Sequence, residues 1–519
     1  MTAHLSGGEE LDAVVVGGGW NGLVCATVLA RSGLAVALVE ETLALGGAHR
    51  VEQPFANAPR LGALVGQHRA GLVPPDLGAR LGMALPVTSA APGFFVPTPV
   101  PGRFLFAGGD HLTGIEGADA AALAAMDAEL GAIAADLGPA WTRPAFELEE
   151  IAARHVRPEL RAAFVGLSRG SFAAYAARFG LESGLLRGAL AIEALADGFA
   201  SLDAPGGGAA LLVRHAARRT TASVPALGRA LVEAARAAGV RFSVGQPVAQ
   251  IVVDGNNASG ILLADGTFQR AAAVVSSADP WRLRALVGAD RFPADHTRRI
   301  DALLPIGGFA KLTLAVTALP RFAALPDAHG QHARTTFLLP AAAGEDDTVR
   351  AIVRAHAEAM AGHVPVAPAI ACVTPTAEDP SLQDPEGRHS LSLLVPWMPY
   401  DLVGTTWAAE EERFTEALLD VIEPFAPGLR ASVVEAILWH PKKLESHFGT
   451  TRGFLGQLDD TMLFGDRLRA TTGVNGLYSC AAACGPAAGV VGAAGVAAAE
   501  RVIEDLELAL ERTELGVHR

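Results

Sequence analysis

The sequence has few cysteines, little positive charge and no long apolar segment, and each shortage disfavours a class of protein. Four cysteines in 519 residues are too few for a disulfide framework, which favours a reducing compartment. Acidic residues outnumber basic ones by 55 to 41, so the net charge is −14 and no basic face for nucleic acid is expected. The same balance disfavours electrostatic attachment to anionic lipid.

Membrane-spanning and secreted proteins are disfavoured by a second shortage. The most apolar stretch, residues 485–499, is rich in glycine and alanine and shorter than the roughly 20 residues that a spanning helix needs. The N-terminus shows no basic patch followed by an apolar core, so we expect no secretory signal. We therefore expect a cytoplasmic protein, while peripheral membrane contact and a homo-oligomer are left open.

Glycine, by contrast, is abundant, and three glycines near the N-terminus form a motif. A valine-rich run at residues 13–16 is typical of a buried parallel strand, and glycines follow it in the spacing G-x-G-x-x-G. We predict a helix over residues 21–32 and a second strand over residues 35–39. In such a unit the helix N-terminus binds a dinucleotide pyrophosphate, and an acid after the second strand binds a ribose hydroxyl. The candidate residues are Gly17, Gly19, Asn21, Gly22 and Glu40.

The alternative is a structural βαβ turn without a ligand. The ordered succession of strand, glycines, helix, strand and acid disfavours it. A glycine pair, Gly46 and Gly47, follows the acid and leaves the backbone free to pass close to a cofactor. FAD-binding chains of the amine oxidase and phytoene desaturase type carry a glycine pair at this place, and this resemblance favours FAD over NAD.

A second nucleotide segment is predicted between residues 224 and 276. An amphipathic helix over residues 224–239 precedes a strand over residues 240–244, a small hairpin and a strand ending at residue 276. This layout resembles the second FAD segment of the same families, in which the backbone after the first strand meets the adenine. The resemblance implies a contact at Val248, whose alternative is an ordinary strand valine.

The C-terminal part carries another glycine-rich motif. A short strand over residues 476–480 precedes a run of small residues and a helix from about residue 491 to 506. Such a helix can direct free N–H groups and the positive end of its dipole at a flavin, which stabilises the anionic reduced state. The candidate residues are Gly489, Val490 and Gly492.

Together, VVVGGGWNGLVCATVLARSG near the N-terminus, MPYDL and the C-terminal GLYSC…GPAAGVVGAAGVAAAE resemble the phytoene desaturase-like FAD-dependent oxidoreductases. Within them, the chain looks most like the branch of pyridine nucleotide-disulphide oxidoreductase domain-containing protein 2. The resemblance implies an α/β fold. It combines a Rossmann-like FAD-binding domain, with a parallel sheet that is discontinuous in sequence, and an inserted α+β substrate domain. The expected FAD domain comprises residues 1–75, 220–285 and 445–519, and the substrate domain residues 76–219 and 286–444.

The same resemblance implies that FAD desaturates, saturates or isomerises a hydrophobic small molecule of polyene or isoprenoid type. An amine oxidase-type flavoenzyme and a non-catalytic, FAD-stabilised scaffold or interaction protein remain as alternatives. Relatives carry H-P-G-G-G where this chain has G-P-A-A-G at residues 485–489, so an imidazole near the flavin is missing.

Catalytic residues are poorly marked by the sequence. Lys311, in a predicted strand, is a candidate to hold a water or accept a proton near the flavin, although a solvated lysine at a strand end is favoured. Cys484 is a candidate thiol beside the flavin, against packing as a small apolar residue. The histidines and cysteines show no ligand spacing, so no metal site is predicted.

Overall fold

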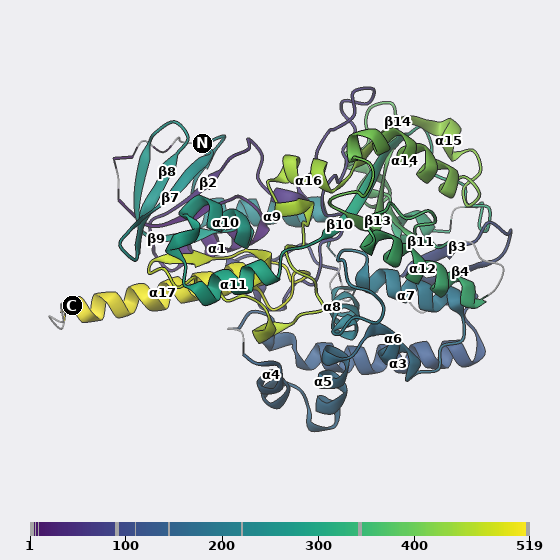
Figure 1. The fold of residues 1–519 in the computed structure, drawn as a ribbon, viewed down its shortest axis with the longest axis horizontal. Coiled ribbons are helices and arrows are strands. Elements are labelled where there is room, and N and C mark those ends of the chain that lie inside the picture. Colours follow the sequence, from purple (N-terminus) through teal and green to yellow (C-terminus); the bar gives the residue numbers. More distant parts are fainter. Residues whose placement is uncertain are drawn as a thin grey trace.

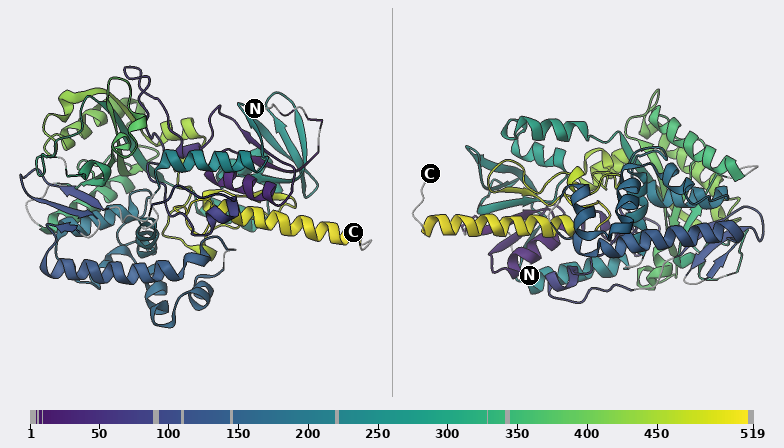
Figure 2. Two further views of the ribbon diagram at one scale, coloured as in Figure 1. Left: turned by 180° about the vertical axis from the view of Figure 1, so that it is seen from behind. Right: turned by 90° about the horizontal axis from the view of Figure 1, so that it is seen from below.

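Two β-sheets organise the chain (Figure 1). The computed structural model describes residues 5, 7–8, 10–88, 93–108, 111–143, 146–218, 222–327, 329–340 and 345–514. Figure 2 shows the two sheets in separate lobes, with the C-terminal helix α17 extending away along one lobe.

The first sheet has seven strands in the order β6-β2-β1-β9-β8-β7, and β15 pairs with β9. The pairings of β1 with β2 and β9, of β2 with β6, and of β15 with β9 are parallel. The strands β7, β8 and β9 pair antiparallel, as successive hairpins do. The bounds are β1 (Leu11–Val16), β2 (Val36–Glu40), β6 (Arg241–Val244), β7 (Val248–Asp254), β8 (Asn257–Leu263), β9 (Phe268–Ser276) and β15 (Leu477–Ser479).

Alternate residues of β1 belong to two hydrophobic cores, one on each face of the sheet. Ala13 and Val15 pack with α1, α9 and α17 on one face of the sheet. Val14 and Val16 pack with the β7–β8 hairpin and α10 on the other face. Because both faces are covered, the strand is apolar without interruption. The helices of this lobe are α1 (Trp20–Arg31), α2 (Leu77–Leu81), α9 (Val224–Ala237), α10 (Pro280–Val287), α11 (Ala294–Ala302) and α17 (Ala493–Glu514).

The second sheet has eight strands in the order β14-β10-β13-β12-β11-β3-β4-β5. Its pairings are antiparallel except that of β11 with β3. The central strand β10 is buried along its whole length. The bounds are β3 (Phe94–Pro97), β4 (Phe104–Gly108), β5 (His111–Thr113), β10 (Gly307–Val316), β11 (Thr335–Leu338), β12 (Ile370–Val373), β13 (His389–Pro399) and β14 (Val433–Trp439).

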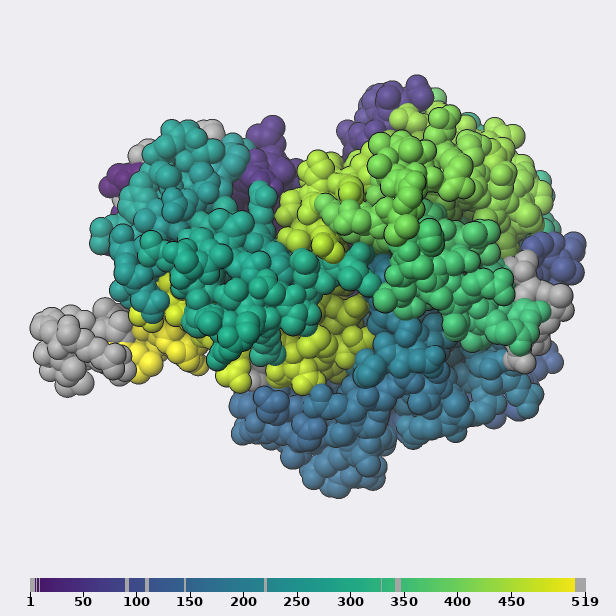
Figure 3. Space-filling view, viewed as in Figure 1, coloured from purple at the N-terminus to yellow at the C-terminus, as the bar shows by residue number. Residues whose placement is uncertain are grey.

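Helices cover both faces of this second sheet. One face packs on α3 to α8 and α12, and the other on α14 and α15. Helix α16 and the loop that follows it lie between the two lobes, where Figure 3 shows them in yellow-green. The bounds are α3 (Gly117–Asp136), α4 (Leu148–His155), α5 (Arg161–Arg169), α6 (Phe172–Ala177), α7 (Gly184–Leu195), α8 (Gly207–Arg218), α12 (Glu345–Met360), α13 (Pro375–Glu378), α14 (Trp407–Ile422), α15 (Leu429–Ser432) and α16 (Pro441–Phe448).

The predicted fold class is confirmed: the parallel part of the first sheet draws its strands from three separate stretches of chain. The N-terminal helix begins one residue earlier than predicted, and the C-terminal helix begins at Ala493 and runs longer. The domain boundaries proposed from the sequence stay a prediction. Within the described residues, no helix has both the length and the apolar character needed to cross a membrane.

Candidate functional site

The glycines of the first loop are required by close backbone contacts. Gly17 has a φ of 98°, in the left-handed region that favours glycine. A Cβ at Gly22 would lie 2.1 Å from the carbonyl oxygen of Gly17, so helix α1 can approach the loop only with glycine there. Gly19 precedes α1 and offers no side-chain cap, which leaves the first N–H groups of the helix available to a ligand.

Glu40 ends β2 and turns back toward this loop. Its carboxylate accepts hydrogen bonds from the Gly18 amide at 2.7 Å and the Thr42 amide at 2.9 Å. A cavity of ≈190 Å³ opens beside it, and its walls include Gly17, Glu40 and Val248. The structure therefore brings the predicted ribose acid and the predicted adenine-side valine to one hollow.

A second cavity, of ≈160 Å³, continues this hollow toward the C-terminal motif. The two cavities share Gly19, Ala48, Ser277, Leu455 and Gln457, and we call them together the nucleotide groove. Ten of the eleven predicted cofactor residues line the groove, and Gly22 lies behind it against Gly17. The ten are Gly17, Gly19, Asn21, Glu40, Gly46, Gly47, Val248, Gly489, Val490 and Gly492.

Helix α17 reaches the groove by crossing α1 at a glycine. A Cβ at Gly495 would lie 2.3 Å from the carbonyl oxygen of Asn21, so the two helices touch through backbone. Upstream, the Leu72 amide donates to Gly489 O and the Val491 amide donates to Leu72 O, both at 2.8 Å. These bonds tie the C-terminal motif to the segment around Leu72, and the helix contact at Gly495 places it beside the N-terminal motif.

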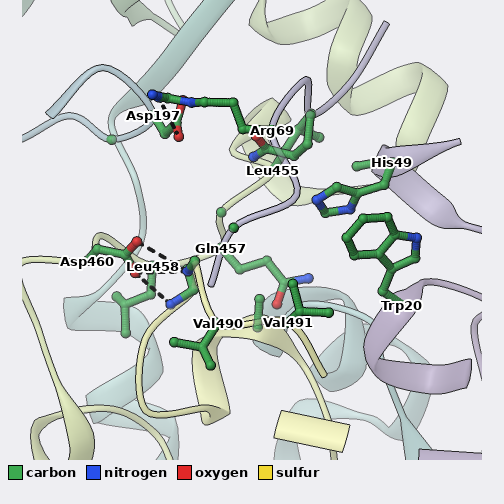
Figure 4. A pocket seen from close by; sticks show the side chains of 18 of the residues that line it. Trp20, His49, Arg69, Asp197, Leu455, Gln457, Leu458, Asp460, Val490 and Val491 are labelled. Carbon is green, nitrogen blue, oxygen red and sulfur yellow. Dashed lines mark hydrogen bonds and ion pairs between the residues drawn. The ribbon is translucent and has the colours of Figure 1, made fainter. Parts of the chain in front are cut away.

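The loop of residues 454–460, which was not predicted from the sequence, forms another wall of the groove. Gln457 has a φ of 60°, which is rare for a non-glycine residue, and its side chain points into the groove (Figure 4). Asp460 accepts hydrogen bonds from the amides of Ala488 and Gly489. No local motif marks this loop, because its residues act only after the chain has folded.

Trp20 and His49 form another wall that the sequence did not mark. Their rings stack with centroids 3.9 Å apart, as Figure 4 shows. Burial lowers the pKa of His49 to about 3, with a smaller contribution from Lys311, so the imidazole is neutral at physiological pH.

Lys311 is not the solvated strand-end residue that the sequence favoured, and that expectation is wrong. The side chain is fully buried, and Nζ donates to the carbonyl oxygens of Leu64 and Gly66 at 2.7 Å each. Burial holds its pKa well below the usual value. Lys311 lies outside the groove lining but fixes the segment that leads to Gln67 and Arg69, which do line it.

Cys484 also lies outside the groove lining, so the structure gives no support to a thiol beside the flavin. It is buried in a small apolar cluster that includes Trp281, Leu458 and Ala481. Burial raises the pKa of the thiol to about 11, which keeps it protonated. Across the described residues, no cluster of three or more histidine, cysteine or acidic side chains is arranged to hold a metal ion.

A charged network closes the far end of the groove. Arg69 pairs with Asp197 at 3.1 Å and with Glu193 at 3.4 Å, and Arg214 also pairs with Asp197. Burial alone would raise the pKa of Asp197, but the guanidinium groups of Arg214 and Arg69 more than offset this and hold it below the usual value. Figure 4 shows Arg69 and Asp197 at one side of the pocket.

Beyond this network lies a third cavity of ≈500 Å³, which we call the side cavity. It shares Arg69, Ala70, Gly71 and Arg214 with the nucleotide groove. Its volume falls within the range of about 300–1,000 Å³ that is typical of small-molecule sites. The groove and the side cavity therefore border each other at these four residues.

The first sheet and its groove have the architecture of a Rossmann-like nucleotide-binding unit. The model of the NAD(P)-binding Rossmann-like domain matches residues 15–62. Solved structures show the same fold. Wild-type putrescine oxidase bound to putrescine is 15% identical, covers 96% of this chain and 99% of its own, and has a TM-score of 0.58. An oxidoreductase from Methanosarcina mazei is 15% identical, with coverage of 96% and 100% and a TM-score of 0.55.

Among curated sequences, the chain is a homologue of the proteins named pyridine nucleotide-disulfide oxidoreductase domain-containing protein 2, as the sequence motifs predicted. The rat protein is 27% identical, with 96% of this chain and 94% of the relative aligned. The mouse protein is 30% identical over 63% of this chain and 59% of its own length.

Proposed function

We propose that this protein is an FAD-dependent oxidoreductase that exchanges a hydride between flavin N5 and a mainly apolar small molecule, which it desaturates, saturates or isomerises. One observation carries the proposal: the N-termini of α1 and α17, from opposite ends of the chain, converge on a single groove. A dinucleotide pyrophosphate accounts for the first helix terminus, and a reduced flavin accounts for the second.

The residues present fit FAD. Glycine at positions 17 and 22 lets helix α1 pack closely on the loop, Gly19 lines the groove with no side chain in its open space, and Glu40 and Val248 line the same cavity. The amides at the start of α17 follow Gly492, whose φ of 68° turns the chain into the helix. Bound there, FAD would supply two-electron chemistry at its N5 atom.

The chain's own residues would bind and orient the cofactor and the substrate, and would take no covalent part in the reaction. The amides of the first turns of α1 and α17 hold negative charge, and Trp20 stacked on His49 walls off one side of the groove. The neutral state of His49 adds no positive charge to a groove wall that already holds Arg69 and Arg214. The side cavity shares Arg69 and Arg214 with the groove, so a substrate held there would lie against the wall that borders the groove.

The apolar walls of the side cavity support an apolar substrate skeleton. Phe94, Val224 and Val373 line it, from β3, α9 and β12. An amine oxidase activity would require an aromatic cage at the reacting carbon. The rings among the described groove-lining residues are Trp20, His49, His447, Phe448 and Phe454. Trp20 stacks on His49, and His447 packs edge-on against Phe448, so these four rings contact each other in pairs. The groove therefore favours the first activity.

The absorption spectrum of the purified protein tests the proposal, followed by denaturation to release any flavin. Flavin absorbance bands with release of free FAD, then anaerobic bleaching by a polyene without peroxide, would support it. Oxygen consumption with peroxide release would instead identify an oxidase. A protein that stays colourless after reconstitution with FAD would refute the proposal.

A Gly19→Val variant provides a matched apo form, because Gly19 lines the groove and no atom lies within 4 Å of an added Cβ, so the side chain would occupy cofactor space without displacing the backbone. It should lose bound FAD while retaining the circular dichroism of a folded protein. A Gly166→Ala variant serves as the glycine control, since nothing lies within 4 Å of the added Cβ.

A further inference from the structure

The side cavity combines apolar walls with an excess of positive charge. Three guanidinium groups, those of Arg69, Arg214 and Arg218, share the carboxylates of Glu193 and Asp197. A third carboxylate, Asp460, approaches Arg214 at 4.0 Å from the groove side and is already occupied by two backbone amides. A bare hydrocarbon gains nothing from such charges, which cost free energy to bury.

Arg218 is the least compensated member of this set. It ends α8, and its Nε lies 3.6 Å from Glu193, a carboxylate that Arg69 approaches more closely. Its Nη2 is buried and has no hydrogen-bond partner among the described residues. The guanidinium also lies 5.8 Å from the ring centroid of Phe94, at the boundary between the charged and the apolar wall. Arg334 adds a further guanidinium to the lining.

The opposite wall does little to neutralise this charge. Glu378 ends α13, lines the side cavity and keeps an exposed side chain. Because this side chain faces solvent, water and salt screen its charge from the buried guanidinium groups. His68, which also lines the cavity, is neutral. Burial, followed by the charges of Lys311 and Arg69, lowers its pKa well below the usual value.

We propose that the side cavity takes an amphipathic substrate with an anionic head group, a carboxylate or a phosphate, bound at Arg218. The planar guanidinium presents paired N–H donors that match either head group. The apolar chain lies along Phe94, Val224 and Val373, and its reacting end lies against the wall that Arg69 shares with the groove. This assignment of the substrate class rests on the proposed function, because it places the reaction where the cavity meets the groove.

Four probes with the same apolar chain test the head group: dodecanoate, dodecyl phosphate, dodecanol and dodecylamine. Each is titrated by calorimetry, below its aggregation concentration, into the FAD-loaded protein. We expect at least one of the two anions to bind tenfold or more tightly than the alcohol, and the amine to bind no better than the alcohol. The stronger of the two anions identifies the head group.

Variants test whether the preference for anionic probes depends on Arg218. Arg218→Met keeps the length and apolar stem of the side chain and should weaken anion binding at least tenfold while leaving dodecanol binding unchanged. Arg218→Lys should retain part of the anion affinity. Arg236→Met, at an exposed position on α9, is the matched control and should bind all four probes as the parent protein does.

Equal affinity for the anions and the alcohol, preference for the amine, or unchanged anion binding in Arg218→Met would each overturn the inference. If the variant fails to fold, the selectivity of the parent protein among the four probes decides alone. FAD content, read from absorbance in every sample, separates the two proposals. An FAD-loaded protein that does not discriminate among the probes refutes only this inference. A protein that cannot take up FAD but binds anions through Arg218 refutes only the proposed function.

Discussion

Arg69 and Asp197 form an ion pair with a distance of 3.1 Å between Nη2 and Oδ2, in the wall that separates the nucleotide groove from the side cavity. They are separated by 128 positions in the sequence, and both side chains are largely buried. Because Arg214 shares the same carboxylate, Asp197 neutralises two guanidinium groups at once.

Asp197→Asn should destabilise the protein, because it leaves Arg69 and Arg214 charged without their shared partner. Removing one member of a buried ion pair costs about 3–5 kcal/mol, which urea unfolding would detect as a lower midpoint. Asp301→Asn is the control, since its pair with Arg284 is at the surface and such pairs contribute about 0–1 kcal/mol. Equal midpoints for the two variants would contradict this role of Asp197.

Gly495→Ala should separate α1 from α17. The added Cβ would lie 2.3 Å from Asn21 O and 3.0 Å from the Cys25 amide nitrogen, both backbone atoms that cannot rotate away. We expect a loss of about 1–3 kcal/mol, typical of overpacking, together with lower FAD content in the purified protein. Gly166→Ala, in the open helix α5, should leave both unchanged or slightly raise stability. Normal FAD content in Gly495→Ala would show that the groove tolerates a shift of α17.

Lys311→Met should loosen the segment before Gln67 and Arg69. The substitution leaves the carbonyl oxygens of Leu64 and Gly66 without their donor, and an unsatisfied buried polar group costs about 1–3 kcal/mol. We expect a lower unfolding midpoint and weaker FAD binding. Lys442→Met, at a half-exposed position, is the control. A normal midpoint with an altered pH profile of flavin reduction would instead return Lys311 to the proton-transfer role considered from the sequence.

Asp459→Asn should stabilise the protein at alkaline pH and have little effect at acid pH. Burial raises the pKa of Asp459 to about 6, although the Phe199 amide donates to it and opposes the shift. An acid with a raised pKa in the folded state binds its proton more tightly than the unfolded chain does. Its contribution to stability is therefore present below about pH 4 and is lost as the pH rises through about 6.

The asparagine variant has no charge to bury, so its advantage over the parent protein should appear between these pH values and reach on the order of 2 kcal/mol at pH 8. Thermal midpoints of the two proteins, measured from pH 5 to pH 8, check this. A difference that stays constant with pH would show that Asp459 does not titrate in this range.

The nucleotide motif could be predicted because it is local. Gly17, Gly22 and Glu40 lie within one βαβ unit, where strand pairing and the packing of a single helix fix their relative positions. The C-terminal glycines were found for the same reason, since helix α17 begins directly after Gly492. For these residues, spacing along the chain determines position in space.

The loop of residues 454–460, the Asp197 network and the side cavity could not be predicted in this way. Gln457 meets Ala48 and Ser277 at the groove, and each comes from a different stretch of chain. Cys484 and Lys311 show the opposite error. The sequence suggested a reactive thiol at Cys484, and either a proton acceptor or a solvated side chain at Lys311. The fold buries both side chains outside the groove lining. Burial and long-range pairing depend on the whole fold.

The sequence by itself determined the glycine-rich loops and the discontinuous α/β sheet on which a dinucleotide site is predicted, because glycine spacing, strand composition and one acid are local features of the chain. Only the tertiary structure decided what surrounds that site. The three arginines that share two carboxylates come from a loop and one helix, and their partners come from another helix and the loop after it. Their charges interact because folding removes them from water and brings them within 4 Å of one another.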